Sequence, residues 1–184
     1  GAFFEWVKYR SHLSRGVTIG TMLQDEALRF IRLGTFLERA DNTARILEVK
    51  YLNLLPGAEG DAETADYYQW SALLRSVSAF EVYRKVYRDH ITPLRVAELL
   101  ILRADMPRSL ARCMKEVYSN LTRVANSRSA ETERMAGELE AHLRFGRIER
   151  IFELGLRNYL EEFRDSIFDL GCRISDDFLI PASA

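Results

Sequence analysis

The sequence predicts an all-α fold: a bundle of about six to eight helices around one long central helix at about residues 22–55. Three observations support this prediction. Only 10 glycines and 4 prolines interrupt 184 residues, which favours long helices over many short strands. Apolar residues recur at three- and four-residue spacing along most of the chain. No segment shows useful apolar–polar alternation or a hairpin dipeptide.

Glycines, prolines and capping side chains mark where the predicted helices begin and end. The helices are expected over residues 3–14, 22–55, 67–87, 93–103, 108–126, 131–145 and 147–171. The glycines within residues 15–21 predict a break before the central helix, with Thr21 as its N-cap. A polar loop is expected over residues 56–64, Asp105 as the cap before the helix from residue 108, and Gly171 as the stop of the last helix.

The composition limits the classes of protein to which this chain can belong. The formal net charge is -1, from 26 basic and 27 acidic residues, which argues against nucleic-acid binding by bulk electrostatics. No apolar run is long enough to cross a bilayer, and no signal-peptide pattern is present. We therefore expect a cytoplasmic protein without nucleic-acid or membrane partners. The length fits a single helical domain over residues 1–184, and because the chain does not begin with Met, we expect it to be part of a longer natural chain.

The sequence offers no pattern typical of a metal site, a cofactor site or an activated nucleophile. Its histidines, His12, His90 and His142, form no Glu-x-x-His pair, so a di-iron bundle is disfavoured. No phosphate-binding glycine loop and no Gly-x-Ser-x-Gly elbow occurs. Cys113 and Cys172 have no metal or disulfide spacing and are expected to be reduced core thiols. We therefore predict no cofactor and no metal.

The central helix is predicted to pack on two sides. Its main apolar face carries Phe30, Leu33, Phe36, Leu37, Ala40, Ala44, Leu47 and Tyr51. A second apolar set, Leu28, Ile31, Ile46 and Val49, lies roughly opposite. A helix that is apolar on two sides needs neighbours on both, so its polar residues are not all expected to reach bulk water.

The charged residues of this helix are the candidate site. Glu38 and Arg39 point about 100° apart and do not pair well with each other, whereas Asp41 and Arg45 have the i,i+4 spacing of an ion pair. Arg29 lies on the apolar face and predicts a second buried polar cluster. The favoured interpretation is an interhelical ion-pair network that fixes the packing of the bundle. The alternative is an acid–base or anion-binding site built from Glu38, Arg39 and Arg45.

A set of aromatic residues follows the central helix. It comprises Tyr67, Tyr68, Trp70, Phe80, Tyr83 and Tyr87. Aromatic residues at helical spacing are usually core residues, so core packing is expected. Exposed aromatics at these positions would instead indicate a partner surface.

Residues 21–47, TMLQDEALRFIRLGTFLERADNTARIL, resemble the second half of proteins in the alpha-E family, bacterial all-helical proteins named for a Glu-Arg motif. The string Leu37-Glu38-Arg39-Ala40-Asp41 carries the motif. The segments around Trp70 and around Met106-Pro107 resemble later helices of the family, with Met106 in place of a phenylalanine. The resemblance covers most of the chain and implies a C-terminal half or a shortened member.

The resemblance also implies which kinds of protein this chain works with. Alpha-E proteins are encoded beside, or fused to, ATP-grasp-type peptide ligases and transglutaminase-like hydrolases. It therefore implies an accessory, partner-binding role in peptide synthesis or modification, and this is our first hypothesis. The second is an enzyme that acts on amide or peptide bonds with Glu38 as acid or base and Arg39 or Arg45 orienting an anionic group. The third is a structural helical domain that forms a homo-oligomer.

Overall fold

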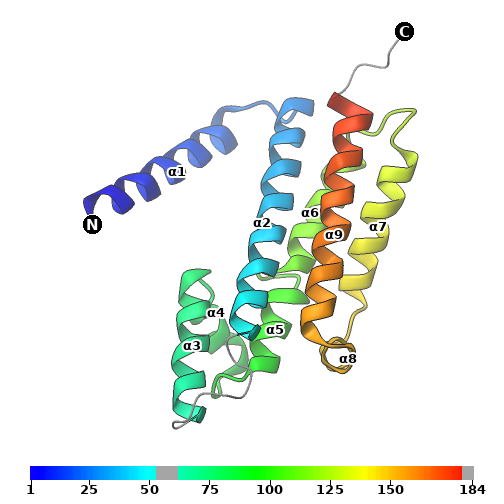
Figure 1. Ribbon diagram of the computed structural model, residues 1–184. Coiled ribbons are helices and arrows are strands. Elements are labelled where there is room, and N and C mark those ends of the chain that lie inside the picture. The colour runs from blue at the N-terminus through cyan, green and yellow to red at the C-terminus, as the bar shows by residue number, and fades with distance from the viewer. Residues whose placement is uncertain (53–61, 180–184) are drawn as a thin grey trace.

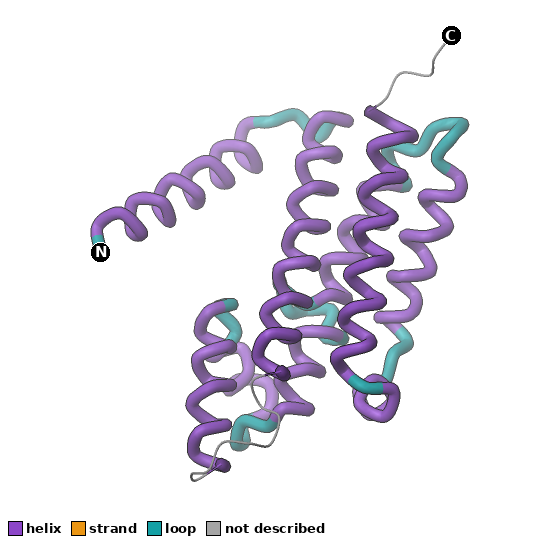
Figure 2. Tube along the Cα trace, in the orientation of Figure 1, coloured by secondary structure: helices purple, strands orange, loops and turns teal. Residues whose placement is uncertain are grey.

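The computed structural model describes the backbone of residues 1–52 and 62–179 and the side chains of residues 1–50 and 67–179. The described residues form nine α-helices, a final π-helical turn and no strand, so the all-α prediction is confirmed (Figure 2). The helices are α1 (Ala2–Thr21), α2 (Glu26–Leu52), α3 (Ala62–Ser76), α4 (Phe80–Tyr87), α5 (Pro93–Ile101), α6 (Leu110–Leu121), α7 (Ala130–Arg144), α8 (Ile148–Leu154) and α9 (Leu156–Ile174), followed by η1 (Ser175–Leu179).

Four long helices make the body of the molecule. Helices α2, α6, α7 and α9 lie side by side, and α2 packs against both α6 and α9 (Figure 1). Helices α3, α4 and α5 gather around the C-terminal end of α2. Helix α1 projects from the opposite end of α2, away from the bundle, and buries none of its residues.

The main apolar face of α2 enters the core as predicted. Leu33, Ala40, Ala44 and Leu47 are at most 1% exposed, and Phe36 is 9% exposed. The side chain of Tyr51, expected on the same face, lies outside the described residues. Burying each large apolar side chain stabilises the fold by about 1.5–3 kcal/mol, so this face determines how α2 sits in the bundle.

The prediction of a second packed side on α2 is wrong for Ile31 and Val49, whereas Leu28 is buried and Ile46 is partly buried against the core. Ile31 is 46% exposed and Val49 is 58% exposed, and only Leu28 of that set is fully buried. The reason is that α6 and α9 both lie against one broad face of α2, which leaves the other side without a covering helix of the bundle. The polar residues on that side therefore reach water.

The predicted break at residues 15–21 is also wrong. Helix α1 continues through Gly16 and Gly20, and α2 begins at Glu26 after an N-cap in which the Leu28 amide donates to Asp25 Oδ1 at 3.2 Å. A glycine inside a helix costs about 1 kcal/mol but does not end it. The carboxylate of Asp25 supplies a capping acceptor in place of Thr21.

Other predicted boundaries also differ from the structure. The expected helix over residues 67–87 is divided between α3 and α4, where Ser78 has a φ of 56°. The expected helix over residues 147–171 is divided at Gly155, whose φ of 94° lies in the region that favours glycine, and α9 continues past Gly171. Ser109 rather than Asp105 caps α6, because its Oγ accepts from the Arg112 amide at 3.0 Å while Asp105 pairs with Arg103. The predicted loop over residues 56–64 lies mostly outside the described residues.

Most of the aromatic set after α2 belongs to the core, as expected. The buried and partly buried members are Trp70, Phe80, Tyr83 and Tyr87. The Tyr83 hydroxyl donates to the His90 carbonyl at 2.9 Å, which ties α4 to the segment before α5. Tyr67 and Tyr68 differ, because they are 45% and 68% exposed.

Candidate functional site

The Glu38-Arg39 pair lies in the middle of α2, where that helix passes the connection between α5 and α6. Arg39 Nη1 donates to the Pro107 carbonyl at 3.2 Å, and Thr43 Oγ1, one turn later, donates to the Arg108 carbonyl at 3.0 Å. Thr43 is only 1% exposed. These two bonds attach residues 106–109 to α2 by satisfying carbonyl groups that no regular helix pairs.

Arg39 lies in a crowded, partly buried position. Its guanidinium carbon lies 5.0 Å from the centre of the Phe36 ring. Burial, followed by repulsion from Arg15, lowers the pKa of Arg39 below its ordinary value. Arg39 is therefore a cation held against the fold and faced by a second cation from α1.

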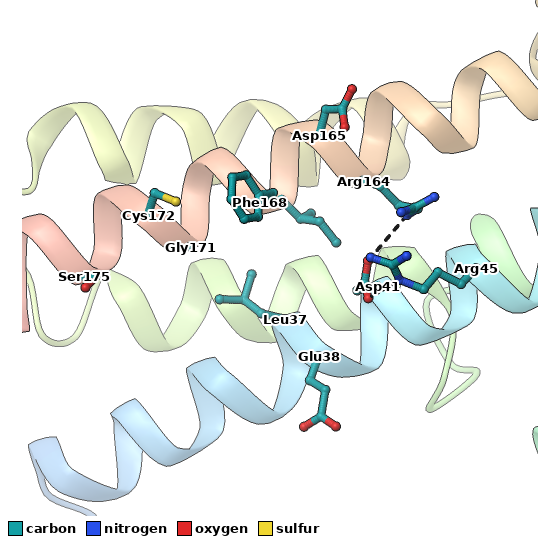
Figure 3. Close-up of a pocket in the computed structure, with 11 residues that line it drawn as sticks. Leu37, Glu38, Asp41, Arg45, Arg164, Asp165, Phe168, Gly171, Cys172 and Ser175 are labelled. Carbon is teal, nitrogen blue, oxygen red and sulfur yellow. Dashed lines mark hydrogen bonds and ion pairs between the residues drawn. The ribbon is translucent and has the colours of Figure 1, made fainter.

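Glu38 has the opposite environment. Its side chain is exposed, and it makes no hydrogen bond or ion pair with any residue that the structure describes. Figure 3 shows it pointing away from α9. The expectation that Glu38 and Arg39 both find partners inside the bundle is therefore wrong for Glu38, because the side of α2 that carries it is uncovered.

Asp41 and Arg45 pair as their spacing predicts, with Arg45 Nε 2.6 Å from Asp41 Oδ2. That hydrogen bond raises the pKa of Arg45. Arg164 of α9 joins them, with its Nε 3.5 Å from Asp41 Oδ1 (Figure 3). Its Nη1 donates to Glu48 at 2.6 Å. The chain of alternating charges links α2 to α9, in agreement with the ion-pair interpretation.

A second polar cluster links α2 to α6. Arg29 donates to the buried Asn120 side chain at 3.2 Å, as its place on the apolar face predicts. Glu116, which sequence reasoning did not identify, accepts from Arg32 at 3.3 Å and lies 2.6 Å from Arg112. The i,i+4 spacing of Arg112 and Glu116 is the signal that could have marked it.

Two hollows flank the Glu-Arg pair. The first, of about 530 Å³, lies between α2 and α9 and has apolar walls of Leu37, Ile167 and Phe168 beside the charges of Asp41, Arg45 and Arg164. The second, of about 780 Å³, lies between α1 and α2. Glu38 is the one candidate residue that lines both, with its carboxylate turned away from α9 (Figure 3).

Comparison with known proteins gives the family. The Alpha-E model, described as a predicted alpha-helical domain with a conserved ER motif, matches residues 1–179. The chain belongs to the Alpha-E family. No curated protein and no solved structure matches it.

Within this Alpha-E chain we assign the ER motif to Glu38 and Arg39. Of the four candidate residues, the structure brings Asp41 and Arg45 together and places Arg39 against Pro107, while Glu38 stays apart. The motif therefore joins an inward-facing cation to an outward-facing carboxylate. That a longer natural chain surrounds this Alpha-E domain stays a prediction.

Other chemistry in this Alpha-E chain is sparse. The core-thiol prediction holds for Cys113, where burial raises the pKa to about 12, but is wrong for Cys172, which is exposed on α9. Among the described residues, no three His, Cys, Asp or Glu side chains gather closely enough to hold a metal ion. No helix in the described part of the chain has the length and apolar character that crossing a membrane requires.

Proposed function

We propose that this Alpha-E chain is a non-catalytic helical module that binds a protein partner in a peptide synthesis or modification system. The partner class is an ATP-grasp-type ligase or a transglutaminase-like protein, which the family resemblance implies. The observation that carries the proposal is α1: a helix of 20 residues, rich in aromatic and aliphatic side chains, with none of them buried.

One side of α1 presents a continuous apolar stripe. Trp6, Tyr9, Leu13 and Val17 follow the spacing of one helix face and are 59%, 65%, 44% and 52% exposed. We call these four residues the outer stripe. Contiguous exposed apolar surface of this kind marks interaction sites, and large aromatic side chains supply much of the energy at protein interfaces.

A helix whose apolar side chains are all exposed to water gains little stability from packing. Most of the stability of a protein helix comes from packing of its apolar face, which α1 lacks, and α1 also contains two glycines, Gly16 and Gly20. Covering the outer stripe with a partner would stabilise α1 by removing its apolar area from water. The arrangement is thus suited to a helix that gains its packing on binding.

The test is co-expression of the full chain with an ATP-grasp-type ligase and, separately, with a transglutaminase-like protein from the same organism. We expect a 1:1 complex with at least one of them by sizing and calorimetry. The Trp6→Ser/Leu13→Ser variant should weaken it by at least about tenfold, since interface aromatic residues often carry more than 1 kcal/mol each. The melting temperature should not change, because both residues are exposed.

The matched control is Phe145→Ser, which removes a 75% exposed aromatic residue at the end of α7 and should leave the affinity unchanged. Absence of a complex with either protein would contradict the proposal. A stable dimer of the chain alone, lost in the Trp6→Ser/Leu13→Ser variant, would instead support the homo-oligomer hypothesis.

A second candidate function, catalysis on amide or peptide bonds, is favoured by the open carboxylate of Glu38. It is exposed, makes no described polar contact, and lines the same hollow as Arg45. If Glu38 is the acid or base, Glu38→Gln should lower any amide-bond formation or hydrolysis by the purified chain by about a hundredfold or more. Unchanged turnover in a variant with wild-type circular dichroism would exclude Glu38 from that role.

A further inference from the structure

The hollow between α1 and α2, which we call the α1–α2 groove, is a cationic site with an apolar floor. Arginines of both helices line it, together with Ile19 of α1 and Ile31 of α2. On α1, the groove is lined by Ser11, Ser14 and Thr18, which are spaced three and four residues apart on one face of the helix. The outer stripe does not line the groove. The groove and the outer stripe are therefore separate surfaces of one helix.

The charges of the groove are unbalanced. Four arginines line it against one acidic residue, Glu38. Arg32 pairs with Glu116, and Arg39 donates to a carbonyl, but Arg10 and Arg15 form no ion pair with any described residue. The guanidinium carbon of Arg10 lies 5.9 Å from the centre of the Trp6 ring. The two cations without an acidic partner among the described residues thus come from α1, on the wall that lies outside the bundle.

The arginines also repel one another across the groove. Repulsion from Arg15 adds to burial in lowering the pKa of Arg39, which means that the two guanidinium groups lie close enough to disfavour each other's charge. An anion placed between them would remove this repulsion and could accept bidentate hydrogen bonds from the guanidinium groups.

The floor of the groove is apolar, so a ligand that carries only charges is not the best match for it. Ile31 is 46% exposed and Ile19 is 60% exposed, and Leu28 and Phe36 close the space beneath them. An occupant that covers these residues has an apolar side as well as acidic groups. The α2 residues that line the groove run from Leu28 to Arg39, about 16 Å along the helix axis, which is the length of a helix of about three turns.

We propose that the α1–α2 groove receives an acidic amphipathic helix of the partner protein, with its apolar side on Ile19 and Ile31 and its carboxylates facing Arg10 and Arg15. This inference rests on the proposed partner-binding function and names the chemistry of the partner. On this proposal the hollow between α1 and α2 is the binding site.

The experiment uses the full chain and a fluorescent 16-residue peptide with Leu at helical spacing on one side and Glu elsewhere. Fluorescence anisotropy should show saturable binding that weakens with added salt. A peptide with Gln in place of every Glu should bind at least about tenfold more weakly. The Arg15→Glu variant should bind the acidic peptide at least about tenfold more weakly. This change in affinity is equivalent to the loss of one strong charged contact.

Lys8→Glu is the matched control, since it changes the charge of the same helix by the same amount but at a residue outside the groove, where Lys8 pairs with Glu5. It should change the affinity less than threefold. Equal losses in Arg15→Glu and Lys8→Glu, or equal binding of the Gln peptide, would overturn the inference. Tighter Arg15-dependent binding of an oligothymidylate of equal charge would overturn it in favour of a nucleic-acid ligand.

The two proposals fail in distinguishable ways. If a complex with the ligase-type protein forms, but binding of the peptide does not depend on its charge or on Arg15, the groove assignment is wrong and the partner-binding function stands. If the acidic peptide binds as expected but neither partner-class protein forms a complex, the groove assignment stands and the proposed partner class is wrong.

Discussion

Replacing Glu116 with alanine is expected to lower the free energy of unfolding by about 2–3 kcal/mol. Its two carboxylate oxygens serve two cations, with Oε2 3.3 Å from Arg32 Nη2 of α2 and Oε1 2.6 Å from Arg112 Nη2 of α6. The side chain is 15% exposed, so water replaces these bonds only in part. Both arginines are about 40% exposed and can turn to solvent, which keeps the loss below that of a sealed ion pair.

The measurement is equilibrium unfolding in urea, followed by circular dichroism. Glu153→Ala provides the control, because Glu153 is 63% exposed and pairs at 3.0 Å with Arg150 on the surface of α8. That variant should lose less than about 1 kcal/mol. Similar losses in the two variants would show that the Glu116 cluster does not hold α2 to α6.

The helical fold and the main core face could be predicted because both depend on local periodicity. The spacing of Leu33, Ala40 and Leu47 specifies which side of α2 is apolar, and the bundle covers that side. The same reasoning failed for Ile31 and Val49, because periodicity shows that a side is apolar but not that a neighbour covers it. In this protein, that uncovered side is where the candidate binding surface lies.

The candidate site was predictable only where its contacts are local. Asp41 and Arg45 belong to one helix, and their spacing alone places them together. The contact of Arg39 with Pro107 spans 68 residues and depends on the order in which helices pack, which no local pattern encodes. The same holds for Arg164, which reaches Glu48 from α9 across 116 residues.

The second large effect is expected at Arg39 and Thr43. Arg39→Met keeps the stem of the side chain but removes the donor to Pro107, and Thr43→Val removes the donor to Arg108 at a position that is 1% exposed. Each change should cost about 1–2 kcal/mol, and the double variant about 2–4 kcal/mol, because both carbonyl groups then lose their partner. Heat or urea unfolding of the two single variants and the double variant checks this.

We infer that the Glu-Arg pair has two separate roles: Arg39 supports the fold, while Glu38 stays available at the surface. Unfolding of the matched variants Glu38→Gln and Arg39→Met in urea, side by side, tests this inference. We expect Glu38→Gln to stay within about 0.5 kcal/mol of the wild type and Arg39→Met to lose about 1–2 kcal/mol. Equal destabilisation by the two substitutions would contradict the claim and return Glu38 to the ion-pair network of the bundle.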